Sequence, residues 1–163
     1  MQLSISNIAW TPEERIASYD AMCELGVTGL EIAPGLFFHQ ADDPFLPSMD
    51  VTEAALSEIR ERGLELVSMQ SLLFGVTDAG LFQGAEQRAN LEIGMNRAIA
   101  LAGRFGIPNL VFGSPGQRRV PEGLSMKQAL DQAAEVFHNF AVAAQSAGTK
   151  IAIEANPYAY GTN

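Results

Sequence analysis

The stretch GVTGLEIAPG, residues 26–35, contains the unit that decides the fold: a glycine, then a short apolar strand that ends near a polar residue. The same unit recurs at Gly63 before LELVSMQS, at Gly106 before IPNLVFGSP and at Gly148 before TKIAIEANP. Each glycine follows a helical pattern, and glycine is the residue best able to end a helix in the left-handed conformation. The sequence therefore predicts strands and helices in regular alternation.

The predicted helices have recognisable starts and one apolar face each. Thr11, Asp50 and Ser125 are candidate capping residues, because a glutamate or glutamine follows each of them three positions later. Helices with a single apolar face pack against a sheet. The apolar positions are Leu91, Met95, Ala98, Ile99, Ala102 and Phe105 in the third helix, and Met126, Leu130, Ala133, Phe137, Phe140, Ala141 and Ala144 in the fourth.

This alternation predicts parallel strands joined by helical crossovers, in either a doubly wound sheet or a (β/α)8 barrel. The turn NIAWTPEER after the first strand lacks the glycine-rich fingerprint of dinucleotide-binding folds, and no Walker A motif occurs. Polar residues close the strands, as is typical of a barrel. We therefore expect one α/β domain over residues 1–163, of the (β/α)8 TIM-barrel type but incomplete, with about five strands and four helices. The strand-closing residues are Asn7, Glu31, Gln70, Ser114, Glu154 and Asn156.

Composition excludes several classes of protein. The 19 acidic and 10 basic residues give a net charge of −9, which argues against nucleic acid binding. No apolar run is long enough to span a membrane, and no signal peptide is predicted at the N-terminus. The single cysteine, Cys23, is typical of a reducing cytoplasm, and its place among apolar helix positions predicts core packing.

Glu154 is the strand-end residue whose side chain most strongly indicates a chemical role. Ile151 and Ile153 should share one face of the last strand and pack against helices, while Ala152 and Glu154 share the other and point into the barrel. A carboxylate there needs a cation or a proton. Binding of a divalent metal is the most economical role, and solvation or pairing with Lys150 or an arginine is the alternative.

The runs KIAIEANPYAYGTN, LVFGSP and GVTGLEIAPG resemble the sugar phosphate isomerase/epimerase family of xylose isomerase-like TIM barrels. The resemblance covers strands one to five of eight. It implies that Glu154 is the first ligand of a Mn²⁺, Mg²⁺ or Co²⁺ ion and one of two acid/base carboxylates. The family takes its other ligands from strands six to eight, so we expect an N-terminal portion with an incomplete site. Tyr160 stands where some ketose epimerases have another glutamate.

The remaining strand-end residues are candidates for substrate binding. Asn7 and Gln70 could bind sugar hydroxyls, as could Ser114 and Asn156, while Glu31 could line the pocket or hydrogen-bond within the barrel. The turn after Ser114 ends in Arg118, which could meet a phosphate or carboxylate but is more simply an exposed turn residue.

The two histidines are weaker candidates. His39 lies near Asp42 and Asp43 in the loop after the second strand, and a His-Asp-Asp cluster can bind metal. Exposure is the simpler interpretation of that loop. His138 lies off the apolar stripe of its helix, so we expect it on a solvated face.

Two functions are therefore predicted from the sequence. The first is a sugar (phosphate) isomerase or epimerase that moves a proton next to the carbonyl of a small sugar or hydroxy-carbonyl compound, inactive as this chain alone. The second is a non-catalytic half-barrel that associates with itself or with a missing C-terminal half. An endonuclease IV-like function is set aside, because Met69-Gln70 and Phe112-Gly113 stand where strand-end histidines would be needed.

Overall fold

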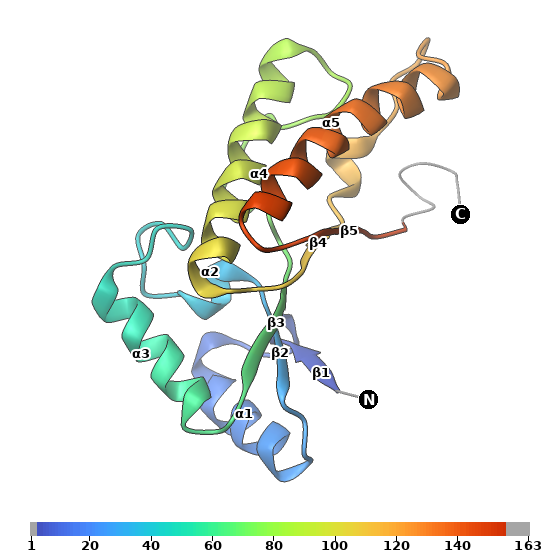
Figure 1. The fold of residues 1–163 in the computed structure, drawn as a ribbon. Helices are drawn as coiled ribbons and strands as arrows, with labels where there is room; N and C mark the ends of the chain where they lie inside the picture. The colour runs from blue at the N-terminus through green and yellow to red at the C-terminus, as the bar shows by residue number, and fades with distance from the viewer. Residues whose placement is uncertain (1–2, 156–163) are drawn as a thin grey trace.

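The computed structural model describes residues 3–155, and these residues alternate between strands and helices as the sequence predicts (Figure 1). A single sheet contains all five strands, and the longer helices connect them. In chain order the elements are β1 (Ser4–Ser6), the 3-10 helices η1 (Asn7–Ala9) and η2 (Pro12–Glu14), α1 (Arg15–Glu24), β2 (Gly29–Ile32), α2 (Pro34–Phe37), α3 (Met49–Arg60), β3 (Glu65–Met69), α4 (Ala85–Phe105), β4 (Leu110–Phe112), the 3-10 helix η3 (Pro115–Arg118), α5 (Met126–Ser146) and β5 (Ile151–Ile153).

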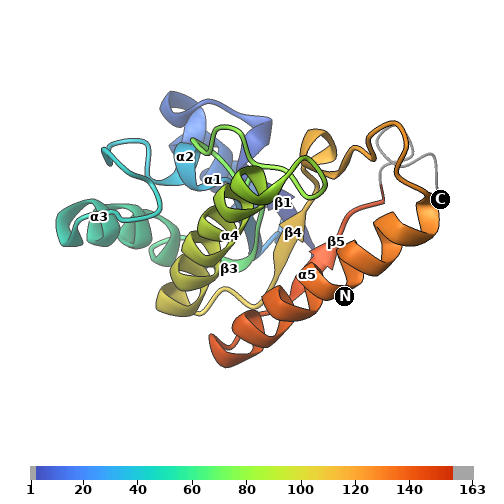
Figure 2. The same cartoon turned by 90° about the horizontal axis from the view of Figure 1, so that it is seen from above.

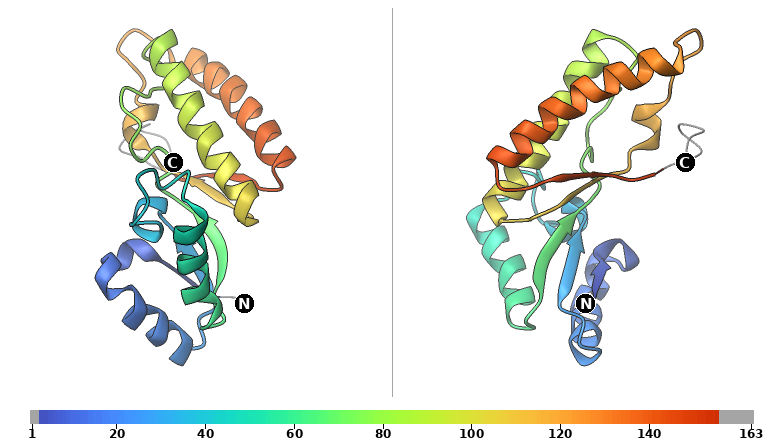
Figure 3. Two further views of the ribbon diagram at one scale, coloured as in Figure 1. Left: turned by 90° about the vertical axis from the view of Figure 1, so that its left-hand side faces the viewer. Right: turned by 45° about the vertical axis from the view of Figure 1, so that its right-hand side comes forward.

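Every pair of neighbouring strands in the sheet is parallel, and the strand order β1-β2-β3-β4-β5 follows the chain. Parallel neighbours need a crossover, which α1, α3, α4 and α5 provide. The predicted order of five strands and four crossover helices is confirmed, and α2 is an additional short helix in the loop after β2. All five strands therefore end at the same edge of the sheet, where their following loops meet (Figure 3).

The two faces of the sheet differ in burial. Leu30, Met69 and Leu110 point to one face and have no exposed surface, because the helices cover that face (Figure 2). The opposite face presents Ser6 and Glu31, which lie beside each other on β1 and β2. Strand alternation separates the two sets, so the apolar residues form the core and the polar residues form a second, more open surface.

The four predicted helix-ending glycines adopt the left-handed conformation. Gly26, Gly63, Gly106 and Gly148 have φ values of 64° to 76°, which L side chains adopt only with strain. Each of them stands between a helix and the strand that follows it. These positions set where each crossover ends and so fix the regular alternation of the chain.

The capping predictions are confirmed at two helix starts and wrong at the third. Thr11 and Ser125 each form a capping box with the residue three positions later. Asp50 does not cap its helix. The Ser48 hydroxyl accepts a hydrogen bond from the Val51 backbone N–H at 3.3 Å, so α3 begins two residues earlier than predicted.

The apolar stripe predicted for α4 is confirmed, whereas that of α5 is only partly correct. All six predicted positions of α4 lie in or against the core. In α5 the exposed fractions of Met126 and Leu130 are 40% and 55%, and Ala141 is exposed as well. The buried face is displaced from the predicted one and contains Ala129, Val136, Phe140 and Ala144. An alanine-rich helix offers more than one apolar stripe, and periodicity alone does not decide which of them packs.

The prediction that Cys23 packs in the core is wrong, because its side chain is exposed on α1. The neighbouring Met22 takes the buried position instead, together with Tyr19 one turn earlier. Tyr19 packs edge-to-face against Trp10, with ring centroids 5.9 Å apart, and burial raises the pKa of its phenol to about 12. Among the described residues, none of the helices combines the length and apolarity needed to cross a membrane.

Candidate functional site

A cavity of about 220 Å³ lies at the carboxyl ends of β3, β4 and β5. Three of the residues predicted from strand ends, Gln70, Ser114 and Glu154, line this one cavity. Their sequence positions are far apart, and parallel pairing of the three strands brings them together. The full lining is Gln70, Ser71, Val111, Gly113, Ser114, Pro115 and Glu154.

The pairing of β4 with β5 places the Glu154 carboxylate. Phe112 lies opposite Ile153, and the Glu154 backbone N–H donates to the Phe112 carbonyl at 3.1 Å. This register sets Glu154 beside Gly113. A Cβ atom on Gly113 would lie 2.7 Å from Glu154 Oε2, closer than real Cβ contacts. Glycine at this position therefore leaves the space that the carboxylate occupies.

Arg118 holds the backbone of Glu154. Its side chain is only 3% exposed, and its Nη2 donates to the Glu154 carbonyl oxygen at 3.0 Å. The guanidinium carbon also lies 5.8 Å from the centroid of the Phe112 ring, within range of a cation–π contact. The interpretation of Arg118 as an exposed turn residue is therefore wrong. No local sequence pattern predicts this burial, because it depends on a contact between η3 and the end of β5.

Glu31 and Gln70 form a polar cluster with Ser6 on the open face of the sheet. The Gln70 side-chain amide donates to Glu31 Oε1 at 2.7 Å and to Ser6 Oγ at 2.6 Å. Of the two roles considered for Glu31, the structure shows the hydrogen bond within the sheet. Since Gln70 also lines the cavity, the cluster links the ends of β1 and β2 to the cavity wall.

The remaining substrate-binding candidates lie elsewhere. The buried amide of Asn7 accepts a hydrogen bond from the Ala33 N–H at 2.7 Å and donates to the Ala33 carbonyl at 3.4 Å. Asn7 thus joins the end of β1 to the end of β2, and this use leaves its predicted contact with substrate untested. Asn156 and Tyr160 lie outside the described residues.

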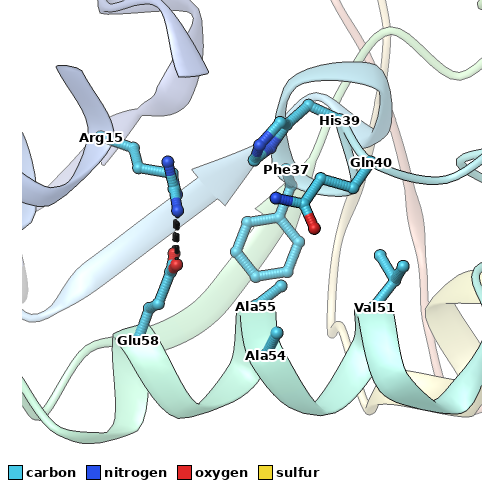
Figure 4. A pocket seen from close by; sticks show the side chains of 8 residues that line it. All are labelled: Arg15, Phe37, His39, Gln40, Val51, Ala54, Ala55 and Glu58. Atoms are coloured by element: carbon cyan, nitrogen blue, oxygen red, sulfur yellow. Dashed lines mark hydrogen bonds and ion pairs between the residues drawn. The ribbon is translucent and has the colours of Figure 1, made fainter. Parts of the chain in front are cut away.

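A second, much smaller cavity of about 20 Å³ lies on the outer side of the sheet between α1, α2 and α3 (Figure 4). The Arg15–Glu58 ion pair, at 2.6 Å, closes one side of it, and the hydrogen bond to Glu58 holds the pKa of Arg15 above its ordinary value. His39 points into this cavity without Asp42 or Asp43 beside it. Asp43 instead accepts from the Phe45 N–H at 2.9 Å and lies 3.6 Å from Arg97. The His-Asp-Asp cluster considered as an alternative therefore does not form within residues 3–155, and His39 is half-buried where exposure was expected.

His138 is exposed on α5, as expected. Among residues 3–155, no three His, Cys, Asp or Glu side chains lie close enough together to hold a metal ion. Glu154 is the only acidic residue in the lining of the larger cavity. Because Mg²⁺ and Mn²⁺ need several ligands, the described residues do not fit a complete divalent-metal site, and the role of Glu154 as a ligand stays a prediction.

Known proteins match this chain in structure but not in sequence. No protein-family model matches the sequence, and no curated protein matches it at a significant level. Among solved structures, 3-keto-D-glucoside 4-epimerase from E. coli matches 94% of this chain and 55% of its own, with a TM-score of 0.65 and 20% identity. D-psicose 3-epimerase from Clostridium cellulolyticum H10, solved with D-tagatose, aligns with 98% of this chain over 54% of its own length, with a TM-score of 0.71 and 14% identity.

The chain has the fold of the xylose isomerase-like TIM-barrel isomerases and epimerases. It spans about half the length of the solved structures that it matches. Mannonate dehydratase from Streptococcus suis serotype 2 has the same fold, with a TM-score of 0.61 and 15% identity over 94% of this chain and 53% of its own. At these identities the likeness establishes the fold, and fold alone does not select a reaction.

Substitution of Gly113 by alanine should disturb the cavity without unfolding the chain. The added Cβ would push the Glu154 carboxylate from its position. We expect the backbone amide signals of Gly113 and Glu154 to shift in a two-dimensional NMR spectrum, with the free energy of unfolding changed by about 0.5 kcal/mol or less. Gly116→Ala is the matched control, because a Cβ there meets nothing within 4 Å. An unshifted Glu154 signal in the Gly113→Ala variant would contradict the contact between Gly113 and the carboxylate.

Substitution of Arg118 by methionine should destabilise the chain by about 1.5–3 kcal/mol, the usual contribution of a hydrogen bond to a charged group. The free energy of unfolding in urea is the measurement. Arg119→Met is the control, because Arg119 is exposed and surface substitutions change stability by about 0.5 kcal/mol or less. The same stability for both variants would show that Arg118 does not hold the end of β5.

Proposed function

We propose that the larger cavity binds a small polyhydroxylated carbonyl compound, of the class on which sugar isomerases and epimerases act. One observation supports this most directly: the Glu154 carboxylate lines the same cavity as the neutral polar residues Gln70 and Ser114. Neutral polar groups suit sugar hydroxyls, and a carboxylate suits proton transfer. The cavity also lies at the carboxyl ends of parallel strands, where TIM barrels have their active sites.

In this proposal Glu154 is the proton-transfer group. Its carboxylate accepts a proton from the carbon next to the substrate carbonyl, and hydrogen bonds from the cavity wall hold the sugar hydroxyls in place. Gly113 keeps the space around the carboxylate open, and Arg118 fixes the backbone from which it projects. Epimerisation needs a second group on the opposite face of that carbon. Among residues 3–155 the cavity lining holds no second carboxylate, so we assign to this chain substrate binding and one proton-transfer step.

A second candidate function is that of a half-barrel that associates with another chain. β1 and β5 are the two edge strands of the described sheet, and Ile153 on β5 is 54% exposed. Edge strands present unpaired backbone groups on which further strands can form. The matching structures contain about twice the length of this chain, which favours completion by further strands.

The proposed binding function is tested by substituting Glu154 with glutamine. Glutamine keeps the shape of the side chain but removes the charge, and hydrogen bonds to charged groups are worth about 1.5–3 kcal/mol, so the dissociation constant for D-tagatose should rise about tenfold or more. Isothermal titration calorimetry with the full chain measures this dissociation constant. Glu135→Gln, on the exposed side of α5, is the isosteric control. The proposal fails if the unsubstituted chain binds no D-tagatose, or if both variants bind equally.

The half-barrel candidate makes a different prediction about mass. Exposed edges and an open polar face should make the purified chain self-associate, and light scattering should then give a mass above the 17.5 kDa of a single chain. A stable monomer across a range of concentrations would contradict self-association and leave the binding proposal as it stands.

A further inference from the structure

Two serines in the lining of the larger cavity have backbone conformations that serine rarely adopts. Ser71 has a φ of 57°, and Ser114 has φ and ψ of 31° and 59°. Positive φ values are uncommon for residues other than glycine, asparagine and aspartate. Ser114 also precedes Pro115, and the residue before a proline favours extended conformations, which Ser114 does not adopt. Both positions would be less strained with glycine.

The two serines occupy equivalent places on neighbouring strands. Each is the second residue after its strand ends, at Met69 in β3 and at Phe112 in β4. The carbonyl of each accepts a hydrogen bond from the backbone N–H three residues later, at 3.0 Å from Phe74 and 3.2 Å from Gln117. The same local turn is therefore built twice, after β3 and after β4.

The loops that contain the two serines are also joined to each other. The Leu81 N–H donates to the Gln117 carbonyl at 2.8 Å, and the Gln83 side chain donates to the Arg119 carbonyl at 3.2 Å. These bonds fix the loop after β3 against η3. These hydrogen bonds between the two loops hold the backbone around both serines, so the packing of the loops determines the serine conformations.

The hydroxyl groups of both serines are available to a ligand. Within residues 3–155, neither hydroxyl makes a hydrogen bond, and both serines line the cavity that contains Glu154. A serine hydroxyl can donate one hydrogen bond and accept two, which matches the hydroxyl groups of a sugar. Backbone strain that persists at a cavity is a recognised sign of function.

We infer that Ser71 and Ser114 are ligand-contacting residues whose hydroxyls bind adjacent hydroxyl groups of a polyhydroxylated substrate. This inference rests on the proposed function and deepens it, because it assigns the specificity for a polyol to two named side chains. Ser71 was not predicted from the sequence, and Ser114 was predicted only from its place at a strand end. The hydrogen bonds of the two serine hydroxyls to the ligand, which glycine could not make, then compensate for the strain of the backbone.

The test compares alanine and glycine at both positions, with D-tagatose as the probe and the full chain as the protein. Alanine removes the hydroxyl and keeps the strain, whereas glycine removes both. We expect the dissociation constant to rise about two- to tenfold for Ser71→Ala, Ser114→Ala and each glycine variant, the usual effect of one lost hydrogen bond. The glycine variants should melt at or above the temperature of the unsubstituted chain, because their backbones are relieved.

Asp78→Gly is the matched control. Asp78 also has a positive φ, of 49°, but it does not line the cavity, so this substitution should relieve strain and leave D-tagatose binding unchanged. If the unsubstituted chain binds D-tagatose and all the serine variants bind it equally well, the assignment of the serines is overturned and the proposed function stands. If the unsubstituted chain does not bind it, the proposed function itself fails.

Discussion

The parallel pairing of β4 with β5 is the constraint on which the candidate site depends. With Phe112 opposite Ile153, strand alternation puts Glu154 on the face opposite Ile151, beside Gly113. Ile151 packs against the core as predicted, whereas Ile153 is 54% exposed, so its predicted packing against helices is wrong. A shift of one residue in this register would turn the carboxylate towards the helix-covered face, where it would be costly to bury. Because all five strands run parallel, the polar residues that close them meet at one edge, and the cavity forms there.

The groups around Glu154 fix its position from two directions. Gly113 provides the space for the carboxylate, and the buried Arg118 holds the carbonyl of the same residue through a hydrogen bond of 3.0 Å. Pre-organisation of this kind lowers the entropic cost of placing a catalytic group. Ser71 and Ser114, which have positive φ values, line the same cavity as Glu154.

Local sequence patterns were sufficient to predict the fold. Glycines at the helix ends, two capping boxes and the alternation of Ile151 to Glu154 each specify a short stretch, and together they predict five parallel strands with polar ends. Tertiary packing determined what the sequence did not reveal. Arg118 is buried because its guanidinium bonds to the backbone at the end of β5. Leu130 is exposed because α5 packs through the face that contains Ala129, and Cys23 is exposed because Met22 occupies the core position on α1. Ser48 caps α3 in place of Asp50, because two residues able to cap a helix lie only two positions apart.

The central claim is that the carboxyl ends of β3, β4 and β5 form a binding site for a polyhydroxylated carbonyl compound. The most direct measurement is a two-dimensional amide NMR spectrum of the labelled chain during titration with D-tagatose. The largest shifts should belong to residues of the cavity wall, among them Ser71, Gly113 and Glu154. The largest shifts at the groove between α4 and α5, lined by Asn96 and Asn139, or no shifts at all, would contradict it.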